Sequence, residues 1–304
     1  MLLYKKSDRR RQLGGNINKV YLQCKDPHDT NLWIQSVSAM DVNQERAIVQ
    51  ALINDGVTGK NQQIVVKLGT SPFIRKEYEI GNRIKVIPGF IRFICSMECP
   101  DDLNRYKGRI TRICTSETDS SENVNVLIMP FYEWGTVRKY PWESHPTRFV
   151  SCLKQIVLSL YVAFIKYGFI HTDIHMDNVL LSGTKKNTIK YELPSGHVIQ
   201  VPTHGIRIHI MDLENSFMSV DINETSVFWR DMDRVMTDIK HAGRFEFSQL
   251  HELCVFTEMR LRGNPPLFGV WEFINIIDTI TYVRRQPPPR LISYDPNVFG
   301  ERTM

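Results

Sequence analysis

The most informative segment of the sequence is His171-Thr172-Asp173-Ile174-His175-Met176-Asp177-Asn178. It is the densest polar cluster in the chain, and apolar segments flank it on both sides. Upstream, apolar residues from Phe149 to Phe164 recur at helical spacing and predict a long helix that ends at Gly168. Downstream, residues 179–181 predict a short buried strand. Because both flanking elements are expected to pack, we expect the polar loop between them to be held rigidly.

A second acidic segment and an isolated lysine extend the polar pattern. Residues 206–211 alternate as in a half-buried strand and run directly into Asp212-Leu213-Glu214. Two acidic loops at the ends of buried elements can face one another, and both offer the hard oxygen ligands that suit Mg²⁺. Far upstream, Lys67 follows the apolar run Ile64-Val65-Val66, where a charge needs a carboxylate or phosphate partner.

The polar loop resembles the catalytic loop of protein kinases, whose pattern is H-R-D-L-x-x-x-N. Asp173 falls on the catalytic aspartate, and Asn178 falls on the metal-binding asparagine at the same interval. Asp212 matches the aspartate of D-F-G, and Lys67 matches the lysine of V-A-I-K. The resemblance implies that Lys67 neutralises phosphates and that Asp173 acts on the acceptor hydroxyl. It also implies that Asn178 and Asp212 hold a metal ion.

Three further positions follow from the same resemblance. Glu77 is expected to pair with Lys67, although Glu79 is a rival on another face of the same predicted helix. Met129 ends the strand that leads to the hinge, where adenine would bind. The glycine-rich loop is expected over residues 13–21, in which Gly15 alone lies in register with G-x-G-x-x-G.

Several departures distinguish the chain from typical protein kinases. Thr172 replaces the usual arginine, and His175 replaces a common lysine, which makes the loop similar to those of aminoglycoside, choline and atypical kinases. Asp-Leu-Glu stands where Asp-Phe-Gly is usual, and no A-P-E follows. His171 is expected to support the loop as a packed residue, while His175 is equally consistent with a substrate-facing and a solvated role. Together with the short C-terminal part, these features resemble divergent kinases of large DNA viruses.

The order of the expected elements predicts an α+β, two-lobed protein-kinase-like fold. The N-lobe is expected over residues 1–132, β-rich, with a helical insertion at about 41–55 that Asp41 would cap. The C-lobe is expected over residues 133–304, short and mainly helical. It carries a predicted hairpin insertion at about 183–205.

The predicted function is that of a serine/threonine protein kinase that transfers the γ-phosphoryl group of ATP, with Mg²⁺ or, in its place, Mn²⁺. One alternative is a pseudokinase that acts as a scaffold, which the irregular glycine loop favours. Another is a kinase for small molecules. A third is a metal hydrolase whose transition-metal ligands would be His171, Asp173, His175, Asp177 and Asp212. This last reading leaves Lys67 and Glu77 unexplained.

Composition narrows the partners and the compartment. The net charge is +5 over 304 residues, and the basic clusters lack interleaved aromatics, which argues against nucleic acid. No apolar run reaches the roughly 18 residues of a membrane span. The six scattered cysteines favour a reducing, intracellular compartment, which would be the host cytoplasm or the virion for a viral protein. A protein with a serine or threonine acceptor is the expected partner, and no feature predicts the oligomeric state.

Overall fold

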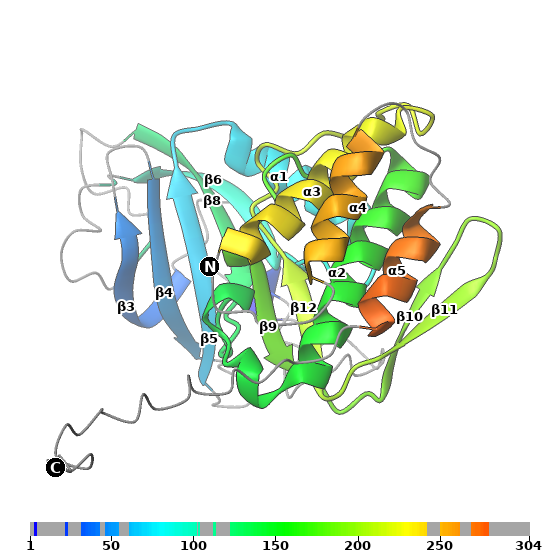
Figure 1. The fold of residues 1–304 in the computed structure, drawn as a ribbon. Helices are drawn as coiled ribbons and strands as arrows, with labels where there is room; N and C mark the ends of the chain where they lie inside the picture. The colour runs from blue at the N-terminus through cyan, green and yellow to red at the C-terminus, as the bar shows by residue number, and fades with distance from the viewer. Residues whose placement is uncertain are drawn as a thin grey trace, which may run out of the picture.

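The computed structural model describes residues 3–4, 22–23, 32–42, 46–54, 61–101, 103, 112–113, 122–241, 250–261 and 269–279. Within this part, strands of an antiparallel sheet fill one side of the molecule and a group of helices fills the other (Figure 1). The predicted α+β class is therefore confirmed. The lobe boundary at residue 132 stays a prediction.

The large sheet has the strand order β6-β8-β5-β4-β3-β7, with antiparallel neighbours throughout. In β5, Ile64, Val66 and Leu68 are fully buried on one face, so Lys67 points to the opposite face. A separate pair of short strands precedes this sheet in the chain. The strands are β1 (Leu3–Tyr4), β2 (Leu22–Gln23), β3 (Leu32–Val42), β4 (Arg46–Asn54), β5 (Asn61–Gly69), β6 (Cys95–Asp101), β7 (Arg112–Ile113) and β8 (Glu122–Pro130).

The helix predicted at residues 41–55 is wrong. The chain there forms the end of β3 and the whole of β4, which pairs with both β3 and β5. Ala47, Val49 and Ala51 are buried at alternate positions, as expected for a strand with one face on the core. The apolar residues also fit a helical period because both faces of β4 carry them, and the pairing with β5 decides between the two patterns.

Helix α1 (Phe73–Ile84) lies against β5, β6 and β8. Its buried stripe contains Ile74, Ile80 and Ile84 at helical spacing, and Glu77 is the charged member of the same stripe. A carboxylate on the buried face of a helix requires a partner. Helix α1 therefore places one acidic group where β5 places one basic group.

Helix α2 (Pro146–Tyr167) forms the centre of the helical side and contacts β12 and α5. Pro146 is at its start, and Gly168 closes its end in the left-handed region with φ 57°. Among the described residues, α2 is the one helix long and apolar enough to cross a membrane, yet 78% of its most apolar window is buried inside the protein. Such burial is typical of a core helix.

The remaining elements build the rest of the helical side. Ile206, Ile208 and Ile210 of β12 are fully buried, and β12 pairs with β9 to form a two-stranded ribbon on α2. The segment of the predicted hairpin insertion contains β10 and β11, which pair antiparallel and are joined through a turn at Pro194-Ser195-Gly196. The elements are η3 (Val137–Lys139), η4 (Trp142–Ser144), η5 (Met176–Asn178), β9 (Val179–Gly183), β10 (Thr188–Glu192), β11 (Val198–Pro202), β12 (Ile206–Ile210), α3 (Thr225–His241), α4 (Leu250–Leu261) and α5 (Gly269–Thr279).

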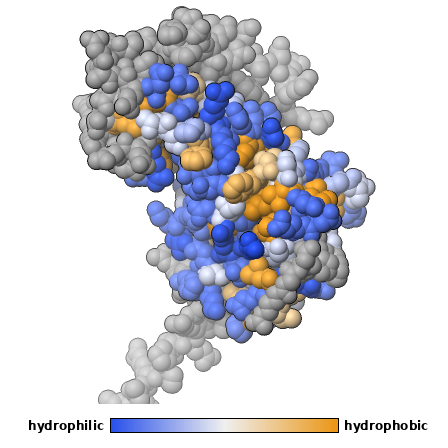
Figure 2. All heavy atoms as spheres, turned by 90° about the horizontal axis from the view of Figure 1, so that it is seen from above, coloured by the Kyte–Doolittle hydropathy of each residue, from blue (hydrophilic) through white to orange (hydrophobic). Residues whose placement is uncertain are grey.

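The described surface in Figure 2 is mostly hydrophilic, with separate apolar patches. Phe73 and Phe217 are among the large apolar side chains that are exposed, at 52% and 57%. Lys76 lies between them, with its Nζ 5.8 Å from the ring centre of Phe73 and 5.0 Å from that of Phe217. Cation–π contacts therefore cover part of this apolar surface.

The cysteines depart in part from the expectation of reduced thiols. Cys95 and Cys99 in β6 each take part in a disulfide bond, although not with one another, because they lie four positions apart in an extended strand. Cys152 and Cys254 are free and buried, as expected for small core residues.

Candidate active site

The basic group of β5 and the acidic group of α1 meet in the structure. Lys67 Nζ donates to Glu77 Oε2 at 2.9 Å, and both residues are almost fully buried, at 5% and 1% exposure. Glu79 is instead exposed and pairs with Arg75 at 3.4 Å one helical turn away. The geometry therefore selects Glu77 over its rival as the partner of Lys67.

The acidic segment after β12 reaches the same lysine. Lys67 Nζ lies 3.0 Å from Asp212 Oδ1 and 2.8 Å from Glu214 Oε2. Oxygen atoms of Glu77, Asp212 and Glu214 all lie within 4.8 Å of one another. One ammonium group thus faces three carboxylates, and such an excess of negative charge suits an additional cation.

The charges of this cluster shift the pKa values of its members. Burial alone would lower the pKa of Lys67, but the carboxylates of Glu77, Asp212 and Glu214 outweigh it and raise the pKa. Burial raises the pKa of Glu77, while Lys67 and a hydrogen bond of 3.1 Å from the backbone N–H of Leu213 oppose the rise. Lys67 therefore stays charged, and α1 is tied to the segment that carries Asp212.

The polar loop lies beside that segment. His171 Nε2 contacts Met211 O at 2.9 Å, and the backbone N–H of Met211 donates to Asn178 O at 2.9 Å. Asn178 Nδ2 donates to the backbone oxygen of Asp173 at 3.0 Å, which leaves its side-chain oxygen available. Asn178 and Asp212 are thereby brought to adjacent positions, and His171, fully buried, takes the supporting place expected of it.

Two residues of this site have backbone conformations that are rare for non-glycine residues. Thr172 has φ 66° and Asp212 has φ 62°. For the β-branched Thr172 this conformation is a true outlier. Such strain concentrates at functional sites, where the surrounding structure holds it in place.

Asp231 of α3 anchors the loop, and the sequence analysis did not find it. Its carboxylate accepts the backbone N–H groups of His171 at 2.7 Å and Thr172 at 3.0 Å. Burial raises the pKa of Asp231 to about 6, although these two hydrogen bonds oppose the rise. The sequence carries no signal for this role, since Asp231 lies far along the chain in an ordinary amphipathic helix.

A second anchor, also missed, connects η3 to the loop. The guanidinium of Arg138 donates to both Asp177 and Asp238, and Asp238 Oδ2 accepts the backbone N–H of Met176 at 2.7 Å. Thr136 Oγ1 also donates to Asp177 at 3.3 Å. Asp177 is therefore used in holding the loop in place.

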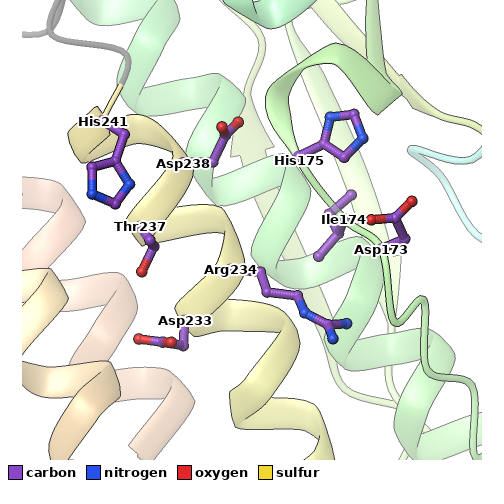
Figure 3. Close-up of a pocket in the computed structure, with 8 residues that line it drawn as sticks. All are labelled: Asp173, Ile174, His175, Asp233, Arg234, Thr237, Asp238 and His241. Carbon is purple, nitrogen blue, oxygen red and sulfur yellow. The ribbon is translucent and has the colours of Figure 1, made fainter.

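Asp173 and His175 face a pocket of about 320 Å³ between the loop and α3 (Figure 3). Asp173 is exposed, and Arg234, Thr237 and His241 of α3 also line this pocket. Asp173 is thus on the accessible side of the loop. A hydroxyl-bearing molecule could approach it from this pocket.

Of the other predicted binding residues, the structure describes Met129 but not Gly15. Met129 lies in β8 opposite Val65 of β5 and is buried. Gly15 and the expected glycine-rich loop lie outside the described residues. The metal-hydrolase set does not converge, because among the described residues the one group of three or more potential metal ligands is Glu77, Asp212 and Glu214.

Comparison with known proteins gives partial matches. The chain is 32% identical over 124 residues to the uncharacterized protein ZK177.2 of Caenorhabditis elegans, covering 41% of this chain and 40% of that protein. It is 39% identical over 71 residues to the serine/threonine-protein kinase haspin of Mus musculus and 38% identical over 71 residues to that of Bos taurus. Each haspin match covers 23% of this chain and 9% of the haspin.

No family model matches the chain. The chain spans less than half the length of these curated relatives. The haspin matches indicate a kinase-like relationship over part of the chain.

Proposed function

We propose that this protein is an ATP-dependent phosphotransferase, and that it acts as a serine/threonine protein kinase. The observation that carries the proposal is the contact of Lys67 with both Glu77 and Asp212, at 2.9 and 3.0 Å. These groups come from β5, α1 and the end of β12, and the same three roles recur in protein kinases. The partial similarity to haspin supports the same class.

The donor set fits a nucleotide with a divalent cation. Asp212 and Asn178 would hold Mg²⁺, with Mn²⁺ as the substitute, and Glu214 offers a further oxygen. When bound, the metal neutralises charge on the phosphates. Lys67, oriented by Glu77, would bind the phosphates. Partly buried apolar side chains of the small cluster that contains Met129, namely Val65 and Leu180, would contact adenine.

Asp173 would orient the acceptor hydroxyl and take its proton. The exposed carboxylate faces the pocket beside α3, while the loop backbone is held by Asp231 and Asp238. Positioned general bases of this kind contribute about 10²- to 10⁴-fold to rate. A serine or threonine side chain of a protein or peptide would reach Asp173 from this pocket of about 320 Å³.

The direct test is phosphate transfer from labelled ATP with Mg²⁺ to peptides that differ only in a serine, threonine or tyrosine acceptor. Wild-type protein should label serine or threonine, and Asp173→Asn should lose about 10²-fold or more in rate. Asp233→Asn is the matched control. Asp233 lines the same pocket, but its carboxylate accepts a hydrogen bond from Thr257 Oγ1 at 3.2 Å and has no proposed role in transfer.

The alternatives predict different results in the same assay. Binding of Mg-ATP without transfer to any acceptor would indicate a pseudokinase. Labelling of choline or an aminoglycoside, but of no peptide, would indicate a small-molecule kinase. Transfer by Asp173→Asn at the wild-type rate would contradict the role given to Asp173.

A further inference from the structure

Arg207 lies in β12 on the side of the strand that faces away from α2. Ile206, Ile208 and Ile210 pack into the core, so Arg207 and His209 point to the other face of the β9–β12 ribbon. Arg207 is partly buried, and its Nε is fully covered without a hydrogen-bond partner. A covered guanidinium nitrogen without a partner is costly.

Arg92 contributes a second positive charge to the same place. The backbone N–H of Ile91 donates to Ile210 O at 2.9 Å, which holds the segment carrying Arg92 beside the end of β12. Arg92 is exposed, and it lies near enough to Arg207 and His209 to act on both electrostatically. Within the described residues, no carboxylate forms an ion pair with Arg92 or Arg207.

Among the residues that the structure describes, the other neighbours add polar atoms but no negative charge. The ring of Tyr132 stacks on that of His209 at 3.8 Å, and His209 Nε2 contacts Ser182 Oγ at 2.8 Å. Burial lowers the pKa of His209 far below its usual value, and Arg207 and Arg92 lower it further, so the imidazole is neutral. Burial raises the pKa of Tyr132, so the phenol is neutral as well.

Three other partly buried arginines have hydrogen-bond partners, whereas Arg207 Nε has none. Arg138 and Arg260 contact carboxylates, and Arg148 donates to His204 O and to the Tyr140 hydroxyl. Burial, followed by repulsion from Arg92, lowers the pKa of Arg207. Two guanidinium groups without a counter-charge, one of them largely covered, therefore form a site whose charge is unbalanced by about two units.

We propose that Arg92 and Arg207, with the hydroxyl groups of Tyr132 and Ser182 beside them, form a binding site for a phosphate monoester or free phosphate. A phosphate carries a charge of about −1.5 to −2 at neutral pH, which matches two guanidinium groups better than one carboxylate does. Guanidinium groups also bind such oxygens through two parallel hydrogen bonds. Tyr132 packs in the apolar cluster that contains Met129, but neither arginine belongs to the candidate active site, so the inference does not depend on the proposed function.

The test measures thermal unfolding of the whole chain with inorganic phosphate, with sodium acetate and with sodium chloride at matched ionic strength. A phosphoserine peptide and its unphosphorylated form are added as two further arms. The variants are Arg207→Met and Arg92→Met, which keep most of the apolar stem and remove the charge. Arg230→Met, at an exposed arginine of α3, is the matched control.

Phosphate at tenfold excess over its Kd should raise the Tm of wild type and of Arg230→Met by about 2–4 °C. Arg92→Met and Arg207→Met should lose at least tenfold in phosphate affinity. A rise with the phosphoserine peptide but not with the serine peptide would support a phosphorylated side chain as the source. A rise with inorganic phosphate alone would support the free ion.

Three outcomes would overturn the proposal. One is the absence of any phosphate effect on wild type. Another is an effect of equal size in Arg92→Met, which would place the anion elsewhere, for example at Lys67. The last is an equal rise with acetate, which would show no preference for a phosphate. If Arg207→Met does not fold, the phosphate affinity of Arg92→Met alone tests the proposal, because replacing the exposed Arg92 should leave the fold intact.

Discussion

Lys67 is the residue on which the candidate site depends, because three carboxylates from two parts of the chain converge on its single ammonium group. Its partner Glu77 is almost fully buried, whereas Asp212 and Glu214 are partly exposed. Lys67 therefore has two separable roles. It compensates a buried carboxylate in the fold, and it contacts the partly exposed carboxylates of Asp212 and Glu214.

The structural role can be measured apart from activity. Lys67→Met should lower the free energy of unfolding by about 3–5 kcal/mol, because Glu77 is left as an unpaired buried charge. Adding Glu77→Gln to Lys67→Met should recover most of this loss without restoring phosphate transfer. Urea denaturation gives the free energies. The exposed ion pair between Arg75 and Glu79 serves as the control. The double variant Arg75→Met with Glu79→Gln should change the free energy of unfolding by about 0.5 kcal/mol or less. A double variant no more stable than Lys67→Met would contradict this account.

Glu214 competes with phosphates for the ammonium group of Lys67, so replacing Glu214 should raise the affinity for metal-free ATP. Glu214→Gln reduces the negative charge that would repel phosphates near Lys67. ATP affinity in the presence of EDTA should therefore rise by about fivefold, which corresponds to about 1 kcal/mol. A fluorescence titration measures it, with Glu79→Gln as the unaffected control. Unchanged or weaker binding by Glu214→Gln would mean that Glu214 does not face the phosphates.

At the scale of elements, α3 holds the polar loop through the backbone. Asp231 accepts the N–H groups of His171 and Thr172, and Asp238 accepts that of Met176. Thr172 is held in a conformation that is costly for a β-branched residue. The helix thus supplies hydrogen bonds that offset strain in the loop.

Asp231→Asn should loosen this loop because the amide has one oxygen for two N–H donors. We expect hydrogen exchange at His171 and Thr172 to become about tenfold faster or more, which corresponds to about 1.4 kcal/mol of local opening energy. Mass spectrometry of peptides that span the loop measures the rate. Asp233→Asn, in the same helix, should leave the rate unchanged. Equal protection in Asp231→Asn and wild type would show that other contacts hold the loop.

Because the pKa of Asp231 is raised, the free energy of unfolding should depend on pH. The pKa of Asp231 is raised from 3.8 to about 6 in the folded protein, so the folded state binds this proton more tightly than the unfolded state. The contribution of Asp231 to stability is therefore greatest at low pH and falls as the pH rises from about 4 to above 6. Relative to Asp231→Asn, wild type should lose about 3 kcal/mol over this window. Denaturation of both proteins at several pH values measures it, and a constant difference would contradict the raised pKa.

Across the whole molecule, the parts that could be predicted are those with a local sequence signal. The long helix before the loop, the strand that carries Lys67, the strand that precedes Asp212 and the α+β class all follow from apolar periodicity. Pairing between Lys67 and Glu77 follows from the resemblance to kinases and is present at 2.9 Å.

The parts that could not be predicted depend on contacts that periodicity does not report. Strand β4 has apolar residues on both faces, so its pattern also fits a helix, and only its pairing with β3 and β5 settles the matter. Asp231 and Arg138 each make two hydrogen bonds to segments distant in sequence. A charged residue in an amphipathic helix or a short turn gives no sign of such a partner.

A single measurement on the intact protein tests whether its distant segments form one nucleotide site. Mg-ATP at a hundredfold excess over its Kd should raise the free energy of unfolding by about 2.7 kcal/mol, because ligand binds the folded state alone. The excess of carboxylates around Lys67 should make this gain depend on the metal, so ATP with EDTA should give much less. Asp212→Asn should lose most of the metal-dependent gain, while Glu79→Gln should keep it. A gain with zinc alone and none with Mg-ATP would instead favour a metal hydrolase, since that chemistry needs the metal but no nucleotide.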